Sequence, residues 1–234
     1  MLFFQVSKKL EFILSIVNNF YERVVKLMNE KIIEVKSHLG VKIRNEYIIQ
    51  DSDVLVIILP GGKYTTLAPL LYYAYNASLQ AGYDVLAIEY GFQNTDQDII
   101  LDKITIENMI NETKDAVDIC TKEKKYKKLI FIGKCIGTFI QNSLINKFRN
   151  YDQKHVFLTP WPECIDGMVA TNSIVIVGTN DNSFKEEHIR KIKDSENIKV
   201  KIIENANHDL EKDDFRESLS VLYEITECIY NFIK

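Results

Sequence analysis

The chain has 234 residues, of which 46% are hydrophobic and 26% charged, and its formal net charge is −4. A chain of this length and composition can bury one sizeable core, so we expect one main domain. The slight excess of acidic residues provides no basic field for nucleic acid or for an anionic lipid surface. The composition therefore disfavours a nucleic-acid-binding protein.

The four cysteines, Cys120, Cys135, Cys164 and Cys228, are far apart in the sequence and form no CxxC pair. This usage differs from the dense cysteine pattern of small secreted proteins that are held together by disulfides. We expect reduced thiols, and hence a cytoplasmic protein.

The N-terminal segment, residues 1–30, is rich in apolar residues that recur at helical spacing, as at Val6, Leu10 and Ile13. Lys8 and Lys9 interrupt it, so no apolar run reaches the roughly 18 residues of a membrane span, and no signal-peptide cleavage site follows. The pattern predicts an amphipathic helical extension. Packing on its own domain is the preferred interpretation, and a homodimer arm is the alternative. The main domain is expected over residues 31–234.

After residue 31, strand-like runs alternate with segments of helical period, which is the pattern of an α/β domain with a mainly parallel sheet. The first two runs are expected to pair as antiparallel strands, and the later runs are continuously apolar, as in strands covered on both faces. The expected strands are Ile32–Ser37, Val41–Ile49, Val54–Leu59, Val85–Glu89, Leu129–Ile132, Val156–Leu158, Ile174–Val177 and Val200–Ile203.

Four helices are expected from apolar stripes of helical period. Their marker residues are Leu70, Ala74 and Ala77; Ile106, Met109, Ile110, Val117 and Cys120; Ile136, Ile140, Leu144 and Phe148; and Phe215, Leu219, Leu222, Ile225, Ile229 and Phe232. Cys120 and Cys228 fall on these stripes, so they are interpreted as core residues.

One segment combines an apolar strand, a glycine-flanked cysteine and the start of a helix: Leu129-Ile130-Phe131-Ile132-Gly133-Lys134-Cys135-Ile136-Gly137. A sharp strand-to-helix turn strains the central residue and brings its flanks into close contact, so glycine is needed on both sides. Cys135 would then be exposed at the carboxyl end of a strand. The helix N-terminus behind it favours a thiolate.

This Gly-x-Cys-x-Gly segment resembles the nucleophile elbow of the α/β-hydrolase superfamily, and the resemblance extends over nearly the whole chain from about residue 31. It implies an enzyme with a mainly parallel sheet. The usual serine is replaced by Cys135, as in the dienelactone hydrolases of that superfamily. Alternatively, Cys135 is a degenerate nucleophile in a scaffold without activity.

The resemblance also implies an acid and a base, in the chain order nucleophile, acid, base. Asp181 follows the strand Ser173–Val177 within Gly178-Thr179-Asn180-Asp181-Asn182, and is the expected acid; Asp166 is a weaker competitor. His208 follows the next strand within Asn205-Ala206-Asn207-His208-Asp209-Leu210, and is the expected base. The remaining histidines, His38, His155 and His188, are interpreted as structural.

The oxyanion donors are expected in Leu59-Pro60-Gly61-Gly62-Lys63-Tyr64, which follows the first buried strand where the superfamily carries its oxyanion loop. We assign the backbone N–H of Gly62 or Lys63, together with that of Ile136 just after the nucleophile. Pro60 replaces the histidine often found there. A plain turn between strand and helix is the alternative interpretation.

Aromatic residues near these loops are expected to shape the substrate pocket: Tyr64, Tyr90, Phe92, Trp161 and Phe184. The short spacing between Cys135 and Asp181 leaves little room for a lid, so the pocket should be shallow and open. It suits a small-molecule substrate.

These residues predict two-step acyl transfer on a small ester, lactone or thioester through a Cys-His-Asp triad. No metal-ligand cluster, Rossmann glycine pattern or P-loop occurs in the sequence, so no metal and no cofactor are expected. An acyltransferase and a non-catalytic binding protein with the same fold remain the alternatives.

Overall fold

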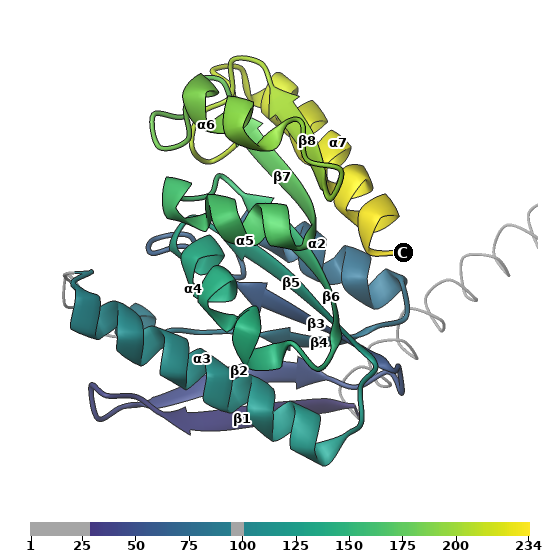
Figure 1. The fold of residues 1–234 in the computed structure, drawn as a ribbon. Helices are drawn as coiled ribbons and strands as arrows, with labels where there is room; N and C mark the ends of the chain where they lie inside the picture. The colour runs from purple at the N-terminus through teal and green to yellow at the C-terminus, as the bar shows by residue number, and fades with distance from the viewer. Residues whose placement is uncertain (1–28, 95–100) are drawn as a thin grey trace, which may run out of the picture.

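The computed structural model describes residues 29–94 and 101–234. Eight strands form one sheet in the order β1-β2-β4-β3-β5-β6-β7-β8 (Figure 1). Its strands are β1 (Glu30–Lys36), β2 (Lys42–Ile48), β3 (Val54–Leu59), β4 (Asp84–Ala87), β5 (Lys128–Lys134), β6 (Asp152–Leu158), β7 (Asn172–Gly178) and β8 (Ile198–Ile203). The α/β class and the mainly parallel sheet predicted from the sequence are thereby confirmed.

The first two strands pair antiparallel, as expected, with Val35 opposite Ile43. β2 also runs antiparallel to β4, and all later pairs are parallel. Parallel neighbours need crossover connections, and helices supply them here. The carboxyl ends of β3 and β5 to β8 consequently meet at one edge of the sheet.

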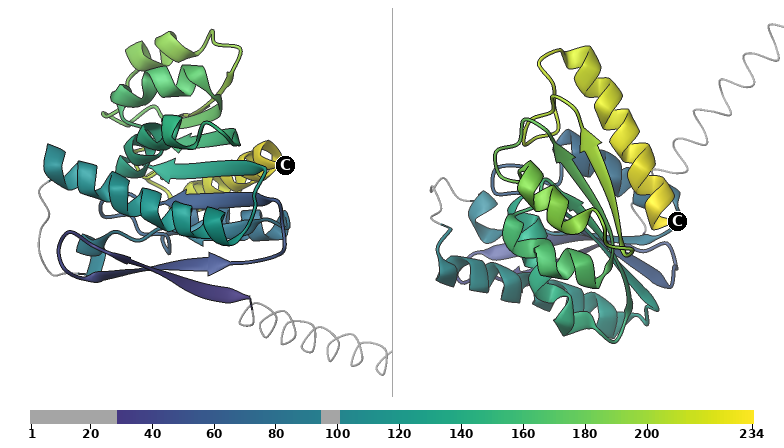
Figure 2. Two further views of the ribbon diagram at one scale, coloured as in Figure 1. Left: turned by 60° about the horizontal axis from the view of Figure 1, so that its bottom comes forward. Right: turned by 45° about the horizontal axis from the view of Figure 1, so that its top comes forward.

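Helices cover both faces of the sheet (Figures 1 and 2). α2 (Pro69–Gln80) and α7 (Phe215–Ile233) pack together on one face. The other face carries α3 (Lys103–Glu123), α4 (Ile136–Leu144), α5 (Ile165–Ala170) and α6 (Glu186–Ile192). Three short 3-10 helices complete the described elements: η1 (Gly91–Asn94), η2 (Asn146–Phe148) and η3 (Pro162–Cys164).

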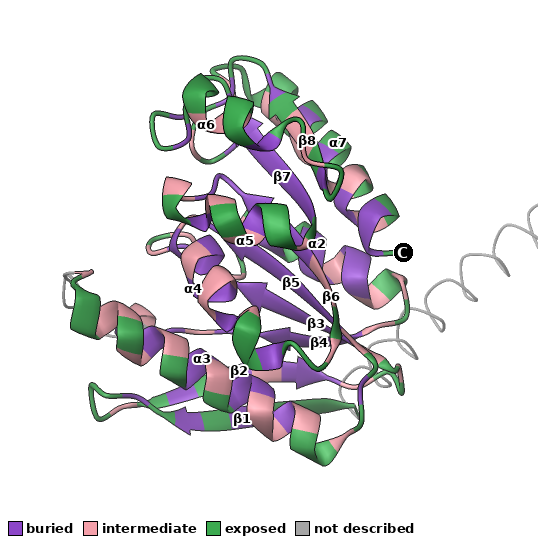
Figure 3. Cartoon of the chain, viewed as in Figure 1, coloured by how far each residue is buried: buried purple, intermediate pink, exposed green. Residues whose placement is uncertain are grey.

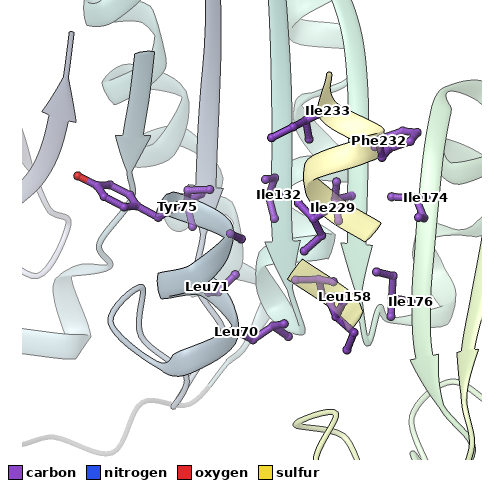
Figure 4. Close-up of a cluster of buried hydrophobic side chains, with 14 of the residues drawn as sticks. Leu70, Leu71, Tyr75, Ile132, Leu158, Ile174, Ile176, Ile229, Phe232 and Ile233 are labelled. Carbon is purple, nitrogen blue, oxygen red and sulfur yellow. The ribbon is translucent and has the colours of Figure 1, made fainter. Parts of the chain in front are cut away.

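The continuously apolar strands are buried on both faces, as Figure 3 shows for the middle of the sheet. In β3, Leu55 and Ile57 face the cluster under α3 and α4, whereas Val56 and Ile58 face the cluster under α2 and α7. This alternation follows the two-residue period of a strand. Figure 4 shows part of the second cluster, where side chains of α2 and α7 meet those of the sheet, among them Ile132 of β5, Leu158 of β6 and Ile176 of β7.

Two cysteines expected in the core lie where their stripes predict. Cys120 is fully buried under α3, and Cys228 packs partly buried against the cluster of α7. Helices α5 and α6 and the polar first half of β6 have no counterpart among the elements expected from the sequence. Those stretches are too short or too polar for an apolar period to reveal them.

β1 begins at Glu30, the last residue of the expected N-terminal extension. Residues 1–28 of that extension lie outside the described residues, so its helix, its possible role in a homodimer and the domain boundary stay predictions. Within residues 29–94 and 101–234, no helix has the length and apolarity of a membrane span.

A buried carboxylate joins three connections at the amino edge of the sheet, opposite the carboxyl ends of the parallel strands. Asp84, at the start of β4, is fully buried. Its Oδ1 accepts the backbone N–H groups of Gln50 and Ser52 at 2.8 and 3.0 Å. Its Oδ2 accepts the Tyr126 hydroxyl at 2.7 Å and the Lys124 ammonium at 2.8 Å. Removal of this carboxylate would leave the two backbone N–H groups without their acceptor and would break its contacts with Tyr126 and Lys124 at the same time.

We therefore expect Asp84→Ala to lower the free energy of unfolding by about 3–5 kcal/mol, the range for removing one partner of a buried ion pair. Urea denaturation at pH 7 measures this change. Asp53→Ala is the control, because Asp53 pairs with Lys127 at the exposed surface, where an ion pair contributes little. Equal small effects of both variants would contradict the prediction.

Candidate active site

Cys135 lies at the sharp turn between β5 and α4. Its backbone has φ 53° and ψ −120°, a conformation that side-chain-bearing residues rarely adopt. A Cβ at Gly133 would lie 2.5 Å from Oε1 of Gln141. A Cβ at Gly137 would lie 2.5 Å from the carbonyl oxygen of Leu59. Both flanks of the cysteine must therefore be glycine, as the sequence pattern indicated.

His208 lies between Asp181 and Cys135. Its Nδ1 is 2.9 Å from Oδ2 of Asp181, and its ring interacts with the Cys135 thiol, with which it shares one cavity. Asp181 is 4% exposed, and its Oδ1 accepts the N–H of Ser183 at 2.8 Å. The structure thus brings Asp181 into contact with His208, and His208 and Cys135 to the same cavity. Asp166, the competing acid, is exposed on α5.

Contact between two loops sets the distance from Asp181 to His208. β7 and β8 are parallel neighbours, and Gly178 at the end of β7 lies opposite Ile203. A Cβ at Gly178 would lie 2.1 Å from the carbonyl oxygen of Ala206, which also accepts the N–H of Asn180 at 2.9 Å. Because Gly178 has no side chain, the loop that carries His208 can lie directly against the loop that carries Asp181.

The surroundings of Cys135 favour the thiolate. Burial by itself would raise the pKa of this thiol. The hydrogen bond and charge of His208 oppose that effect, together with the charge of Lys134 and a hydrogen bond from Trp161, and the net result is a pKa below the ordinary value.

The same contacts favour the imidazolium form of His208. Its hydrogen bond to Asp181 and then its hydrogen bond to Cys135 raise its pKa to about 9, against the opposing effects of burial and of Lys134. Burial would raise the pKa of Asp181, but the hydrogen bonds from His208 and Ser183 lower it below the usual range. Both shifts favour the thiolate–imidazolium pair over the neutral thiol and imidazole.

The loop after β3 lies against the nucleophile. A Cβ at Gly61 would lie 3.5 Å from the Cβ of Cys135, and the N–H of Gly61 is already used by the carbonyl oxygen of Tyr64 at 2.8 Å. Gly62 and Lys63 follow it along the cavity wall. Ile136, the first residue of α4, has an N–H without an acceptor inside the helix.

A cavity of about 270 Å³ opens at this point. Its lining consists of Gly61, Gly62, Lys63, Tyr64, Leu101, Lys134, Cys135, Ile136, His208 and Asp209. The expected oxyanion residues therefore share one cavity with Cys135 and His208. Among residues 29–94 and 101–234, no group of three or more His, Cys, Asp or Glu side chains is placed to hold a metal ion.

The aromatic residues expected at the pocket fall into different positions. Tyr64 lines the cavity, whereas Trp161 is not part of its lining and its ring lies 5.8 Å from that of Phe139. Tyr90 is not at the cavity surface, since it is 1% exposed and its hydroxyl donates to the Pro60 carbonyl at 3.2 Å. It supports the loop after β3 from behind.

Phe92 and Phe184 likewise lie in hydrophobic clusters instead of the pocket. Their loops leave the correct edge of the sheet, but sequence position alone does not say which way a side chain turns.

The other three histidines have structural contacts. His38 binds the carboxylate of Glu112 at 2.8 Å. His155 is fully buried and stacks on Phe131 with ring centroids 5.2 Å apart. His188 accepts the N–H of Lys185 at 2.9 Å, at the start of α6.

Three cavity residues escaped the sequence analysis: Leu101, Lys134 and Asp209. Lys134 and Asp209 are each adjacent to a residue that was singled out, Cys135 and His208. The sequence did contain a signal for Lys134. It follows an apolar strand directly and precedes the nucleophile, and side chains at such a position are covered on both faces of the sheet, so a buried lysine could have been expected there.

No family model and no curated protein sequence matches the chain. Solved structures do match it. An esterase of Pyrococcus furiosus is 17% identical, with a TM-score of 0.65 over 87% of this chain and 91% of the esterase. Est1E of Butyrivibrio proteoclasticus, solved with ferulic acid bound, is 13% identical, with a TM-score of 0.68 over 86% of this chain and 97% of Est1E.

An α/β serine hydrolase without a lid, from Xanthomonas campestris, is 9% identical, with a TM-score of 0.64 over 88% of this chain and 94% of that hydrolase. At these identities the similarity is one of fold. Taken with the sheet order and the strained cysteine between β5 and α4, it shows that this chain has the α/β-hydrolase fold.

Proposed function

We propose that this chain is a hydrolase that acts by acyl transfer on a small ester, lactone or thioester, with Cys135 as nucleophile, His208 as acid and base, and Asp181 as the residue that orients the histidine. The observation that carries the proposal is the hydrogen bond between Asp181 and His208, with His208 sharing one cavity with a cysteine in the strained elbow conformation. Esterases and serine hydrolases among the structures of similar fold support the same reaction class.

In the first half of the reaction, the Cys135 thiolate attacks the carbonyl carbon of the substrate. The carbonyl electron pair moves to its oxygen, which accepts hydrogen bonds from the N–H of Ile136 and of Gly62 or Lys63. The C–O or C–S bond to the leaving group then breaks, and the imidazolium of His208 gives the leaving group its proton. A thioester on Cys135 remains.

In the second half, neutral His208 takes a proton from water as the water oxygen attacks the thioester carbonyl. The C–S bond breaks, the acid is released, and the thiolate–imidazolium pair forms again. Asp181 stays ionised throughout, holds the ring through Nδ1 and stabilises its positive form.

The proposed substrate class follows from the nucleophile and the cavity. A thiolate is a weaker base than an alkoxide and displaces good leaving groups best, which favours activated esters, lactones and thioesters. The cavity of about 270 Å³ suits a small molecule. A cysteine nucleophile also resembles that of the dienelactone hydrolases, which adds lactones to the first substrates for assay.

We predict that iodoacetamide modifies Cys135 ahead of the other three thiols at pH 7. Burial raises the pKa of Cys120 and Cys164 to about 12 and also raises the pKa of Cys228, whereas the pKa of Cys135 is lowered. Only the deprotonated sulfur reacts, so the four thiols should separate by rate. Peptide mapping after brief labelling measures the order.

The pH dependence of this labelling has a defined sign. The thiolate of Cys135 persists as pH falls below the ordinary thiol value, while His208 keeps its proton until about pH 9. His208→Ala removes the hydrogen bond and the charge, so the midpoint of the rate against pH should rise toward the ordinary cysteine value of about 8.5. An unchanged midpoint would remove His208 from the proposed site.

Substitution of the nucleophile tests the proposed function directly. With p-nitrophenyl acetate as substrate, we expect Cys135→Ala to lower kcat/KM on the order of 10⁴-fold or more, as for loss of a nucleophile. Cys135→Ser should lower it on the order of 10²-fold, because a hydroxyl must lose its proton during attack whereas the lowered pKa of the thiol makes the thiolate more readily available. Circular dichroism confirms that each variant is folded.

Equal rates for the parent, Cys135→Ser and Cys135→Ala proteins would refute the proposed function and favour a non-catalytic binding protein. A serine variant as active as the parent would show that the sulfur has no special role. Faster product formation with an added alcohol or amine would show that the acyl group is transferred to that acceptor instead of to water, as in an acyltransferase.

A further inference from the structure

Lys134, the residue before the nucleophile, is a buried cation. Its side chain is 1% exposed, and no other lysine or arginine in the part of the chain described by the structure is buried. A charge removed from water is strongly unfavourable unless it is paired and hydrogen-bonded. The burial of this ammonium next to Cys135 therefore calls for partners.

Those partners come from two loops of the site. The Nζ of Lys134 donates to the carbonyl oxygen of His208 at 3.1 Å and to Oδ1 of Asp209 at 2.8 Å. It also lies 4.4 Å from the centre of the Tyr64 ring, which belongs to the loop after β3. One ammonium thus connects the elbow with the histidine loop and packs against the cavity wall.

The histidine loop has a constrained backbone that needs such support. Asn205 and Leu210, at its two ends, have φ of 61° and 60°, in the left-handed region. Between them, Oδ1 of Asn207 accepts the N–H of Asp209 at 2.8 Å. Lys134 holds this loop from the side of the sheet, at the carbonyl of His208 itself.

We propose that Lys134 is a positioning residue: its contacts with the His208 carbonyl and the Asp209 carboxylate fix the histidine loop, so that the imidazole stays between Asp181 and Cys135. The inference rests on the proposed function only in that Cys135 and His208 form the reactive pair. It adds a second support for His208, which Asp181 holds at the other side of the loop.

The charged and titratable groups that face Lys134 are Asp209, His208, Cys135 and Tyr64. Asp209 is about half exposed, so water screens its charge, whereas Cys135 is partly buried and its interaction with the ammonium is screened less. The charge of Lys134 lowers the pKa of Cys135 and also opposes the imidazolium of His208. Loss of the lysine charge should therefore raise both pKa values and move the reactive pair to higher pH.

Lys134→Met tests the proposal, because methionine fills similar space without donors or charge. The midpoint of iodoacetamide labelling of Cys135 should rise by about half to one pH unit. The kcat for p-nitrophenyl acetate should fall by about 10- to 100-fold with little change in KM, the expected effect of a misplaced base. Lys134→Arg, which keeps the charge and the donors, should restore the midpoint and part of kcat.

Lys154→Met is the matched control. Lys154 also donates to a backbone carbonyl, that of Phe232 at 2.8 Å, and lies over an aromatic ring, but it belongs to the amino-terminal half of β6, away from the site. It should alter thermal stability without moving the Cys135 midpoint. An equal shift in both lysine variants would overturn the proposal, since general loosening of the fold would then explain it.

Other outcomes also decide the question. An unchanged midpoint and kcat in Lys134→Met would show that the side chain only fills space. A rise in KM with constant kcat would make Lys134 a substrate contact instead. If Lys134→Met does not fold, Asp209→Ala tests the other half of the pair: kcat should fall several-fold without a rise in the midpoint, and an unchanged kcat overturns the proposal.

Labelling needs no substrate, so the two proposals can fail separately. A parent protein without turnover of any ester, but with the expected midpoint shift in Lys134→Met, would refute the hydrolase and keep the positioning role. A parent protein that hydrolyses esters at the same rate and pH dependence as Lys134→Met would do the reverse.

Discussion

The strained backbone at Cys135 depends on Gly133 and Gly137, which lie two positions before and two positions after it. A φ of 53° at a residue with a side chain is unfavourable by about 1–3 kcal/mol and persists only where its surroundings hold it. Here Gly137 lets the start of α4 lie against the carbonyl of Leu59, and Gly133 leaves room for Gln141. The contact between Gly137 and Leu59 also brings the loop after β3 beside the sulfur of Cys135. The nucleophile and the expected oxyanion donors are thus positioned by one close approach of two backbones.

Charge in the site is arranged around a single sulfur. Burial works against the thiolate, and His208, Lys134 and Trp161 together outweigh it. His208 in turn keeps its proton because Asp181 and Cys135 both stabilise the imidazolium. A serine in the same position would gain little from these cations, because its hydroxyl stays protonated until attack. The electrostatics of the cavity thus fit the cysteine that the sequence carries, which is the physical basis for proposing it as the nucleophile.

The buried ion pair at Asp84 and the buried lysine at Lys134 occupy opposite edges of the same sheet. At the amino edge, Asp84 accepts hydrogen bonds from loops that connect strands and helices and carry no proposed catalytic residue. At the carboxyl edge, Lys134 makes equivalent contacts with a loop that carries a proposed catalytic side chain. The fold thus contains two buried charges that each have several partners. Asp84 contributes to stability, and Lys134, in our proposal, positions the histidine loop.

The sequence by itself determined the α/β class, all eight strands to within a few residues, and the order of Cys135, Asp181 and His208 along the chain, because apolar period and flanking glycines are local properties. It also placed these residues after strands whose carboxyl ends share one edge. Only the tertiary structure decided how the side chains turn: Tyr90 and Phe184 are buried instead of lining the cavity, and the ring of Trp161 packs near that of Phe139. The contacts of Lys134 with Asp209 join residues 75 positions apart. No local pattern encodes such a pair, because the fold of the whole sheet brings them together.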